Sequence, residues 1–279
     1  MSDLAPSGLH FLGNYTRDIP VNLNRMMENA YDWEHLPFVH PSSFASIDLI
    51  DQGEWGWRCN TSLPPAAGGR KQIVELLVDR PNHYWATTVL EGIGEGVQIH
   101  TQASAKADRQ IEVDVRFYLP QAPETEEQAA IILGYLQAQY ATLYDEDEAL
   151  MSARQVALDC RKSSSDQLAS SVDLGPEVEL DRTQSHSIGL SSGRFVVRYH
   201  EGEWIAHAAV CSHMLGPLGE AKIDTDGSIT CPWHGYRFSL DGGVEAKERC
   251  GALLQPPQLR VVGQNLIAVV EDDVGSAGD

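Results

Sequence analysis

Two short Cys–His motifs near the C-terminal end place the strongest constraint on what this chain can fold into. Cys211 and His213 lie in "CSH", Cys231 and His234 lie in "CPWH", and 17 residues separate His213 from Cys231. Each motif falls at an expected turn between strands, so two thiolates and two imidazoles can converge on one centre. Zinc accepts such a set, although zinc fingers usually pair Cys with Cys and His with His. Alternating pairs suit a cluster with two distinct irons, one held by thiolates and one by imidazoles.

The residues around these motifs extend the constraint to two whole loops. The stretches "CSHMLGPLG" and "CPWHGYRFSLDGG" resemble the ligand loops of a Rieske [2Fe–2S] domain. The resemblance implies that Cys211 and Cys231 bind one iron. It assigns His213 and His234 to the other iron. Trp233 stands where high-potential respiratory Rieske proteins carry a disulfide-forming cysteine, which favours the lower-potential ferredoxin or oxygenase type. The alternative is a zinc ribbon or a set of buried structural residues.

A second group of polar residues lies in "NAYDWEHLPFVHP", in the first part of the chain. Asp32 and His35 would share one face of a continuous helix. His35 and His40 are five residues apart, about 140° around such a helix, so their side chains would diverge. Pro37 is expected to push Leu36 out of the helical region, which would let both imidazoles point at one metal. The alternative is that the histidines cap or pack around a helix break.

Two histidines need a third ligand, and Fe(II) sites that activate O₂ use a carboxylate. The stretch "LYDEDEALMSARQ" lies in a long helix predicted from residue 124 to about residue 162. At about 100° per residue, Asp147 falls in the middle of the apolar stripe of that helix. A carboxylate in an apolar stripe is costly unless it is paired or bound to a metal. Asp147 is therefore the candidate ligand, whereas Asp145, Glu146 and Glu148 are expected to form a solvated face.

The order Asp-x2-His-x4-His, followed by a later carboxylate, resembles the mononuclear-iron site of Rieske non-haem iron oxygenases. The resemblance implies that His35, His40 and Asp147 bind the iron. It implies that Asp32 links a histidine of the cluster, His234, to His35, and that this path crosses between subunits of a head-to-tail homotrimer. The strand-rich middle of the chain and the long helix resemble the helix-grip (START-type) catalytic fold of that family.

The spacing of apolar residues predicts an α+β fold in two domains. A helix at residues 20–30 precedes antiparallel strands between residues 45 and 118, the long helix follows, and short strands resume after about residue 180. The predicted boundaries are a helix-grip catalytic domain at 1–165, a linker at 166–180 and a small all-β Rieske domain at 181–279, ending in a frayed tail, "EDDVGSAGD". The resemblance covers most of residues 15–165 and 180–270, with the Rieske domain after the catalytic domain instead of before it.

Charge and cysteine content limit the partners and the cellular compartment that we expect for the protein. The net charge of -20 disfavours nucleic acid as a partner and suits a basic reductase, although such a charge also simply keeps a protein soluble. No basic leader with an apolar run opens the sequence, and no apolar run approaches about 18 residues, so we expect a cytoplasmic protein without a membrane span. An odd cysteine count fits reduced thiols at Cys59, Cys160 and Cys250.

Taken together, these features predict a terminal oxygenase. A reductase, with or without a ferredoxin, would pass electrons from NAD(P)H to the Rieske cluster and then to the mononuclear Fe(II). O₂ would be used to hydroxylate or oxidatively dealkylate an apolar, aromatic small molecule. The alternative is a Rieske electron-transfer protein fused to a START-like ligand-binding module. Candidates for the pocket wall, with core packing as the alternative, are Tyr84, Trp85, His100, Tyr140 and Tyr144. The remaining histidines, His207 among them, have no assigned role.

Overall fold

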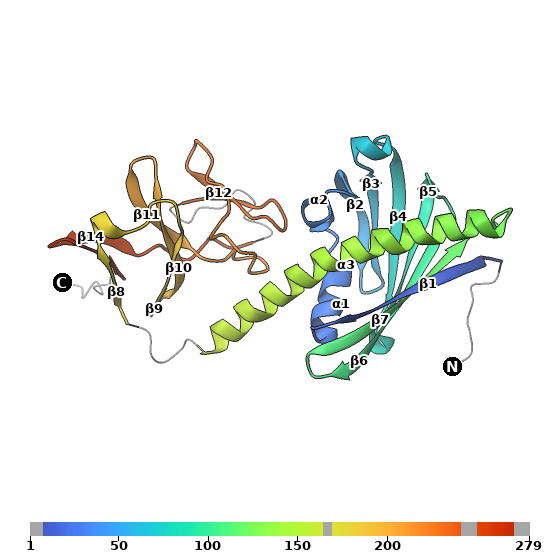
Figure 1. Cartoon of the computed structure of the whole chain (residues 1–279), viewed down its shortest axis with the longest axis horizontal. Coiled ribbons are helices and arrows are strands. Elements are labelled where there is room, and N and C mark those ends of the chain that lie inside the picture. The colour runs from blue at the N-terminus through green and yellow to red at the C-terminus, as the bar shows by residue number, and fades with distance from the viewer. Residues whose placement is uncertain (1–7, 164–168, 241–249, 271–279) are drawn as a thin grey trace, which may run out of the picture. The chain divides into compact units, whose positions relative to one another are not determined.

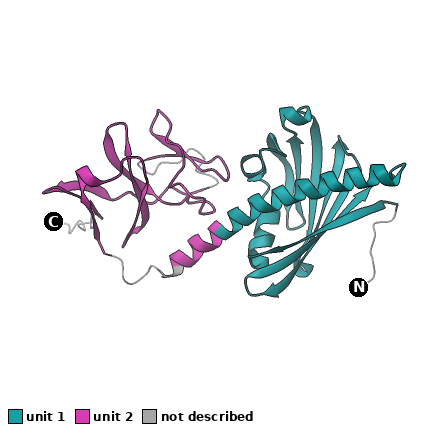
Figure 2. Cartoon of the chain, viewed as in Figure 1, with its two compact units in different colours: residues 1–152 teal, residues 153–279 magenta. Residues whose placement is uncertain are grey.

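The computed structural model describes residues 8–163, 169–240 and 250–270. The chain divides into two compact units, residues 1–152 and 153–279 (Figure 2). Each unit has its own sheets and its own candidate site, so each is described by itself. In these described ranges, no helix combines the length and the hydropathy needed to cross a membrane.

The first unit is built on an antiparallel sheet of seven strands in the order β1-β7-β6-β5-β4-β3-β2 (Figure 1). Its strands are β1 (His10–Ile19), β2 (Ser46–Gly53), β3 (Gly56–Ser62), β4 (Lys71–Asp79), β5 (Tyr84–Gly92), β6 (Gln98–Ala107) and β7 (Gln110–Leu119). Two 3-10 helices, Pro65–Ala67 and Arg80–Asn82, lie in the connections from β3 to β4 and from β4 to β5. This topology confirms the predicted antiparallel sheet.

One face of the sheet is buried because apolar side chains alternate along its strands. The fully buried side chains of β7 are Ile111, Val113, Val115 and Phe117. On the other half of the sheet, Trp57, Leu76 and Thr87 form a cross-strand row through β3, β4 and β5. These three side chains form part of the wall of a cavity in this unit.

The long helix α3 (Glu126–Ser163) runs across the sheet of the first unit, as Figure 1 shows. It is capped by Thr125, whose hydroxyl accepts the Gln128 N–H at 3.1 Å. Gly13 lets the helix approach β1 closely, because a Cβ at that position would lie 2.7 Å from the Leu133 side chain. A seven-stranded antiparallel sheet that holds a long helix is the helix-grip fold, which confirms the predicted fold class.

Two shorter helices, α1 (Leu23–Tyr31) and α2 (Leu36–Val39), connect β1 to β2. The side chain of Asn22 caps the first helix by accepting the Arg25 N–H at 3.0 Å. The helix then buries Met26, Met27 and Ala30. This packing fixes the position of the polar residues that follow α1.

The second unit is a small all-β domain, as predicted. Its strands are β8 (Ser171–Pro176), β9 (His186–Leu190), β10 (Gly193–His200), β11 (Glu203–Ala208), β12 (Ser228–Thr230), β13 (Arg237–Ser239), β14 (Gln258–Val262) and β15 (Asn265–Val269), with a 3-10 helix at Glu177–Glu179. They form two three-stranded sheets, β11-β10-β9 and β14-β15-β8, and one two-stranded sheet, β12-β13. Leu190, Phe195 and Ala268 make a fully buried core cluster.

The predicted linker at 166–180 is wrong over part of its length. Ser171–Pro176 form β8, which pairs with β15. The physical reason is that Val172 and Leu174 alternate with polar neighbours and pack against the buried core cluster. The start of that segment, residues 166–168, and the predicted frayed tail, residues 271–279, lie outside the described residues.

Candidate metal centre, its cavity and the cluster loops

The two histidines of the stretch "NAYDWEHLPFVHP" lie on either side of α2. Helix α1 ends at Tyr31, and the backbone of its C-cap residue, Asp32, leaves the helical region (φ −84°, ψ 88°). His35 precedes α2 and His40 follows it, and their ring centroids are 5.2 Å apart. The helical conformation is therefore interrupted before Pro37 and not at Pro37. Contrary to the sequence prediction, Leu36 is helical and Pro37 lies in the first turn of α2, where its missing N–H costs nothing.

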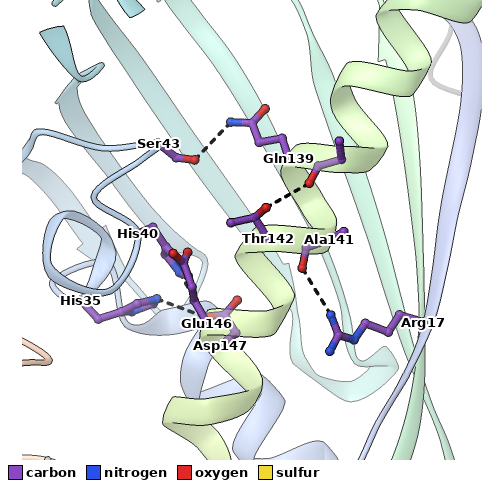
Figure 3. Close-up of polar contacts among 10 residues, drawn as sticks. Arg17, His35, His40, Ser43, Gln139, Ala141, Thr142, Glu146 and Asp147 are labelled. Atoms are coloured by element: carbon purple, nitrogen blue, oxygen red, sulfur yellow. Dashed lines mark hydrogen bonds and ion pairs between the residues drawn. The ribbon is translucent and has the colours of Figure 1, made fainter. Parts of the chain in front are cut away.

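Helix α3 brings Asp147 to both histidines (Figure 3). The Asp147 Oδ1 atom lies 3.1 Å from His40 Nε2 and 3.5 Å from His35 Nε2. One ligand atom from each of the three residues fits within 4.8 Å of the others. His35 is 2% exposed, His40 1% and Asp147 8%. The structure thus brings together the three residues that the sequence predicted as iron ligands, in a buried set of two imidazoles and one carboxylate.

The charges of this group depend on one another. Burial alone would lower the pKa of His35, but its contacts with Asp147 and Asp32 raise that pKa to about 10. Burial likewise opposes ionisation of Asp147, but contacts with His35 and His40 hold the pKa of this carboxyl well below its usual range. The buried Asp147 carboxylate therefore faces the His35 imidazole, which can neutralise it by holding a proton. A divalent cation between the same atoms would neutralise it without one, and this donor set suits Fe(II).

A fourth residue of the site, Glu146, was missed by the sequence prediction, which placed it on a solvated face. Its Oε2 atom lies 2.7 Å from His40 Nδ1, on the side of the ring away from Asp147. Such a contact fixes the ring so that Nε2 points at the metal position. The only signal available in the sequence was its place next to Asp147.

The other carboxylates considered in the sequence analysis have different contacts. Asp32 Oδ2 lies 3.5 Å from His35 Nδ1, so it contacts the ring behind the candidate ligand atom. Asp145 and Glu148 pair with Arg17 of β1. Arg17 also donates to the Ala141 carbonyl (Figure 3). These two carboxylates lie outside the group of candidate ligands.

A cavity of about 130 Å³ opens onto the three candidate ligands. Aromatic side chains form much of its wall, namely Phe44, Trp57, Trp85, Tyr140 and Tyr144. Two other candidates for the pocket wall do not line it. Tyr84 Oη lies 2.6 Å from His100 Nδ1, and both residues belong to the opposite face of the sheet because side chains alternate along β5 and β6.

In the second unit, the two Cys–His motifs lie in loops that are closed by equivalent backbone hydrogen bonds. The Cys211 N–H donates to the Gly216 carbonyl at 2.8 Å, and the Cys231 N–H donates to the Tyr236 carbonyl at 2.8 Å. The His213 and His234 ring centroids are 4.6 Å apart and nearly perpendicular. The structure therefore brings the two predicted imidazoles together at the ends of two similar loops.

The two thiols of these loops also face each other. Contact with Cys211 lowers the pKa of Cys231 to about 5 although burial opposes it, while contact with Cys231 and burial raise the pKa of Cys211. Gly216 packs against the sulfur of Cys231, since a Cβ there would lie 2.7 Å from Sγ. Two buried sulfurs and two adjacent imidazoles are the donor set that a [2Fe–2S] cluster with two thiolate and two imidazole ligands requires.

The remaining cysteines form no disulfide in the described part of the chain. Cys59 is fully buried in β3, and burial raises the pKa of its thiol to about 12. Such a thiol is unreactive at neutral pH. Neither Cys160 nor Cys250 is part of a disulfide.

Comparison with known families identifies the second unit. Residues 170–266 match the Rieske [2Fe–2S] domain family. The chain therefore combines an N-terminal helix-grip domain with a C-terminal Rieske [2Fe–2S] domain. The match begins before β8 and agrees with the pairing of that strand with β15.

Curated relatives match only parts of the chain. A Rieske domain-containing protein of Homo sapiens is 36% identical over 77 residues, which are 26% of this chain and 49% of that protein. Pheophorbide a oxygenase of Oryza sativa subsp. japonica is 44% identical over 41 residues, 15% of this chain and 8% of that protein. The ferredoxin component of the alkene monooxygenase system of Xanthobacter autotrophicus is 31% identical over 72 residues, 26% of this chain and 58% of that protein.

Solved structures resemble about half of the chain. The Zhui aromatase/cyclase from Streptomyces sp. R1128 has a TM-score of 0.45 and 10% identity, covering 53% of this chain and 96% of that one. A START superfamily protein from Mycobacterium smegmatis has a TM-score of 0.43 and 11% identity, covering 50% of this chain and 97% of that one.

Proposed function

We propose that the protein is a terminal oxygenase that combines a Rieske cluster with a mononuclear non-haem Fe(II) site. The observation that carries the proposal is the convergence of His35, His40 and Asp147 on one buried point at the wall of an apolar cavity. Two histidines and one carboxylate are the ligand set of Fe(II) sites that activate O₂. When bound, the mononuclear iron and the cluster supply O₂ activation and one-electron transfer.

The residues of the first unit have distinct parts in this proposal. His35 and His40 offer their Nε2 atoms and Asp147 offers Oδ1, and Glu146 holds the His40 ring from behind. The aromatic wall of the cavity holds an apolar substrate beside these atoms and excludes water from them. The product is a hydroxylated or oxidatively dealkylated small molecule.

The residues of the second unit supply electrons in this proposal. Cys211 and Cys231 would hold one iron of the cluster, and His213 and His234 the other. A reductase, with or without a ferredoxin, would deliver the electrons of NAD(P)H. Asp32, beside His35, would link the two sites between subunits of a homotrimer. The similarity of a short segment to pheophorbide a oxygenase supports the oxygenase class.

A second candidate function is electron transfer by a Rieske domain fused to a ligand-binding module. The similarity to the ferredoxin component of an alkene monooxygenase system favours it, because that match covers more than half of the ferredoxin. In this alternative, the three buried residues would form a structural ion-pair cluster without a metal. The two candidates therefore differ in iron content.

We expect three irons and two acid-labile sulfides per chain after anaerobic purification, and the Asp147→Ala variant should retain only two irons. Loss of one of three ligands removes the mononuclear iron but leaves the cluster loops untouched, so the visible spectrum of the cluster should not change. Measurements of iron, sulfide and visible absorbance check this prediction. Product formation should also be abolished in the variant.

Asp145→Ala is the matched control, because that carboxylate is two residues away and pairs with Arg17 instead. It should keep all three irons. Two irons to two sulfides in the wild type, with full loading of a known oxygenase purified in parallel, would overturn the oxygenase proposal and favour the electron carrier.

A further inference from the structure

One polar side chain in the cavity wall lies outside the group of candidate metal ligands. Asn29 lies in the last turn of α1, is 6% exposed and lines the cavity. Its Oδ1 atom is fully buried and has no hydrogen-bond partner among the described residues. Asparagine is a poor helix former, and a buried polar atom without a partner is costly. A side chain that is unfavourable on both counts is expected to have a partner that binds from the cavity.

The rest of the wall limits what that partner can be. The described residues around the cavity include no Lys or Arg, whereas Asp32 and Asp147 add carboxylates. A carboxylate or phosphate group on the ligand would therefore enter without a cation to pair with it, apart from the metal site itself. A neutral ligand is favoured. Because Oδ1 is an acceptor, the ligand must offer an O–H or N–H donor to satisfy it.

The size of the cavity limits the ligand further. Its volume is about 130 Å³, and an apolar protein cavity of about 150 Å³ holds one benzene molecule. Trp57 and Trp85 on the sheet and Tyr140 on α3 present aromatic surfaces to it. Aromatic side chains favour offset or edge-to-face contact with another ring. The cavity is thus close in size to a site for one aromatic ring.

We propose that Asn29 anchors the substrate, and that the substrate is a neutral single-ring aromatic compound with a hydroxyl or amino group. The Asn29 Oδ1 atom accepts the hydrogen bond of that group, which orients the ring toward the candidate metal ligands. This inference rests on the proposed function, because it takes the cavity to be the substrate site of the oxygenase.

The test compares phenol with toluene, two probes of nearly equal size that differ in the donor. Dissociation constants are measured on the full-length protein, without reductase, from the indole N–H signals of Trp57 and Trp85. The wild type should bind phenol about tenfold more tightly than toluene, since one net hydrogen bond is worth about that factor. Anisole, which has no donor, should bind no better than toluene, and benzoate should bind more weakly than phenol.

The variant Asn29→Leu should lose the preference for phenol and keep its affinity for toluene, because leucine has a similar size but no acceptor. Asn14→Leu, at an exposed position of β1, is the matched control and should behave as the wild type. Equal binding of phenol and toluene by the wild type would overturn the proposal even if the variant failed to fold. So would a phenol preference that survives in Asn29→Leu, or tighter binding of anisole than of phenol.

The iron and sulfide content of the same preparations separates this proposal from the proposed function. Three irons to two sulfides with equal binding of phenol and toluene would overturn the Asn29 anchor alone. Two irons to two sulfides with a phenol preference that depends on Asn29 would overturn the oxygenase alone and leave a ligand-binding cavity of the stated specificity.

Discussion

At the scale of single residues, two consecutive carboxylates of α3 contact opposite edges of the same imidazole. Glu146 Oε2 lies 2.7 Å from His40 Nδ1, and Asp147 Oδ1 lies 3.1 Å from His40 Nε2. Consecutive helical residues point about 100° apart, so His40 must lie in the angle between them. One carboxylate is then placed to bind a metal and the other to orient the ring.

We expect Glu146→Ala to weaken Fe(II) binding by about 10- to 100-fold, the usual effect of removing a carboxylate behind a histidine ligand. Glu146→Gln should bind nearly as the wild type does, because its amide oxygen still accepts from His40 Nδ1–H. Titration of the iron-depleted protein with Fe(II) measures both, while the cluster absorbance reports that the second unit is intact. An alanine variant with unchanged affinity would show that His40 needs no such support.

At the scale of elements, the two ligand loops of the Rieske domain repeat one backbone design. In each loop the residue before the closing carbonyl has a positive φ, 65° at Leu215 and 68° at Gly235. Glycine adopts this conformation freely, whereas leucine does so at a cost. Leu215 is buried, and the carbonyl of the next residue, Gly216, accepts the Cys211 N–H that closes the loop.

We expect Gly216→Ala to lose the cluster, because the added Cβ would lie 2.7 Å from the sulfur of Cys231. Gly219→Ala is the matched control in the same segment. There the nearest atom, on Val196, is 3.6 Å from the added Cβ, which is ordinary contact. Visible absorbance and sulfide content of the purified variants measure the outcome. Full cluster content in Gly216→Ala would mean that the loop can move away from the sulfur.

At the scale of the whole molecule, we expect acid to destabilise the fold through a histidine that has no part in either site. His207 in β11 is fully buried, and burial lowers its pKa to about 4. In the unfolded chain the pKa is about 6.5. Between those values the unfolded chain binds one more proton, so the stability present above pH 6.5 is lost as the pH falls toward 4. The loss is on the order of 3 kcal/mol.

We therefore expect His207→Leu to flatten the fall in the free energy of unfolding of the second unit between pH 6.5 and 4.5. Urea unfolding at several pH values, followed by circular dichroism, measures this slope. His10→Leu, at an exposed position of β1, should leave the slope unchanged. An equal slope in wild type and His207→Leu would show that other groups cause the acid sensitivity.

The sequence alone determined the features that depend on local pattern. The spacing around Cys211, His213, Cys231 and His234 predicted the Rieske domain, and alternation and helical spacing predicted the strands and the long helix. The phase of Asp147 in that helix predicted its burial, which the structure confirms. These predictions succeed because a side chain's direction follows from its position along a helix or strand.

The tertiary structure alone decided the features that depend on packing between distant segments. Glu146 meets His40 across 106 residues, and the cavity brings Asn29 of α1 together with Trp57 and Leu76 of the sheet. The interruption of the helix before α2 lies at Asp32 and not at Pro37, and β8 forms inside the segment predicted as a linker. No local pattern encodes these outcomes, because each is set by how closely a helix or strand packs against a surface built from other parts of the chain.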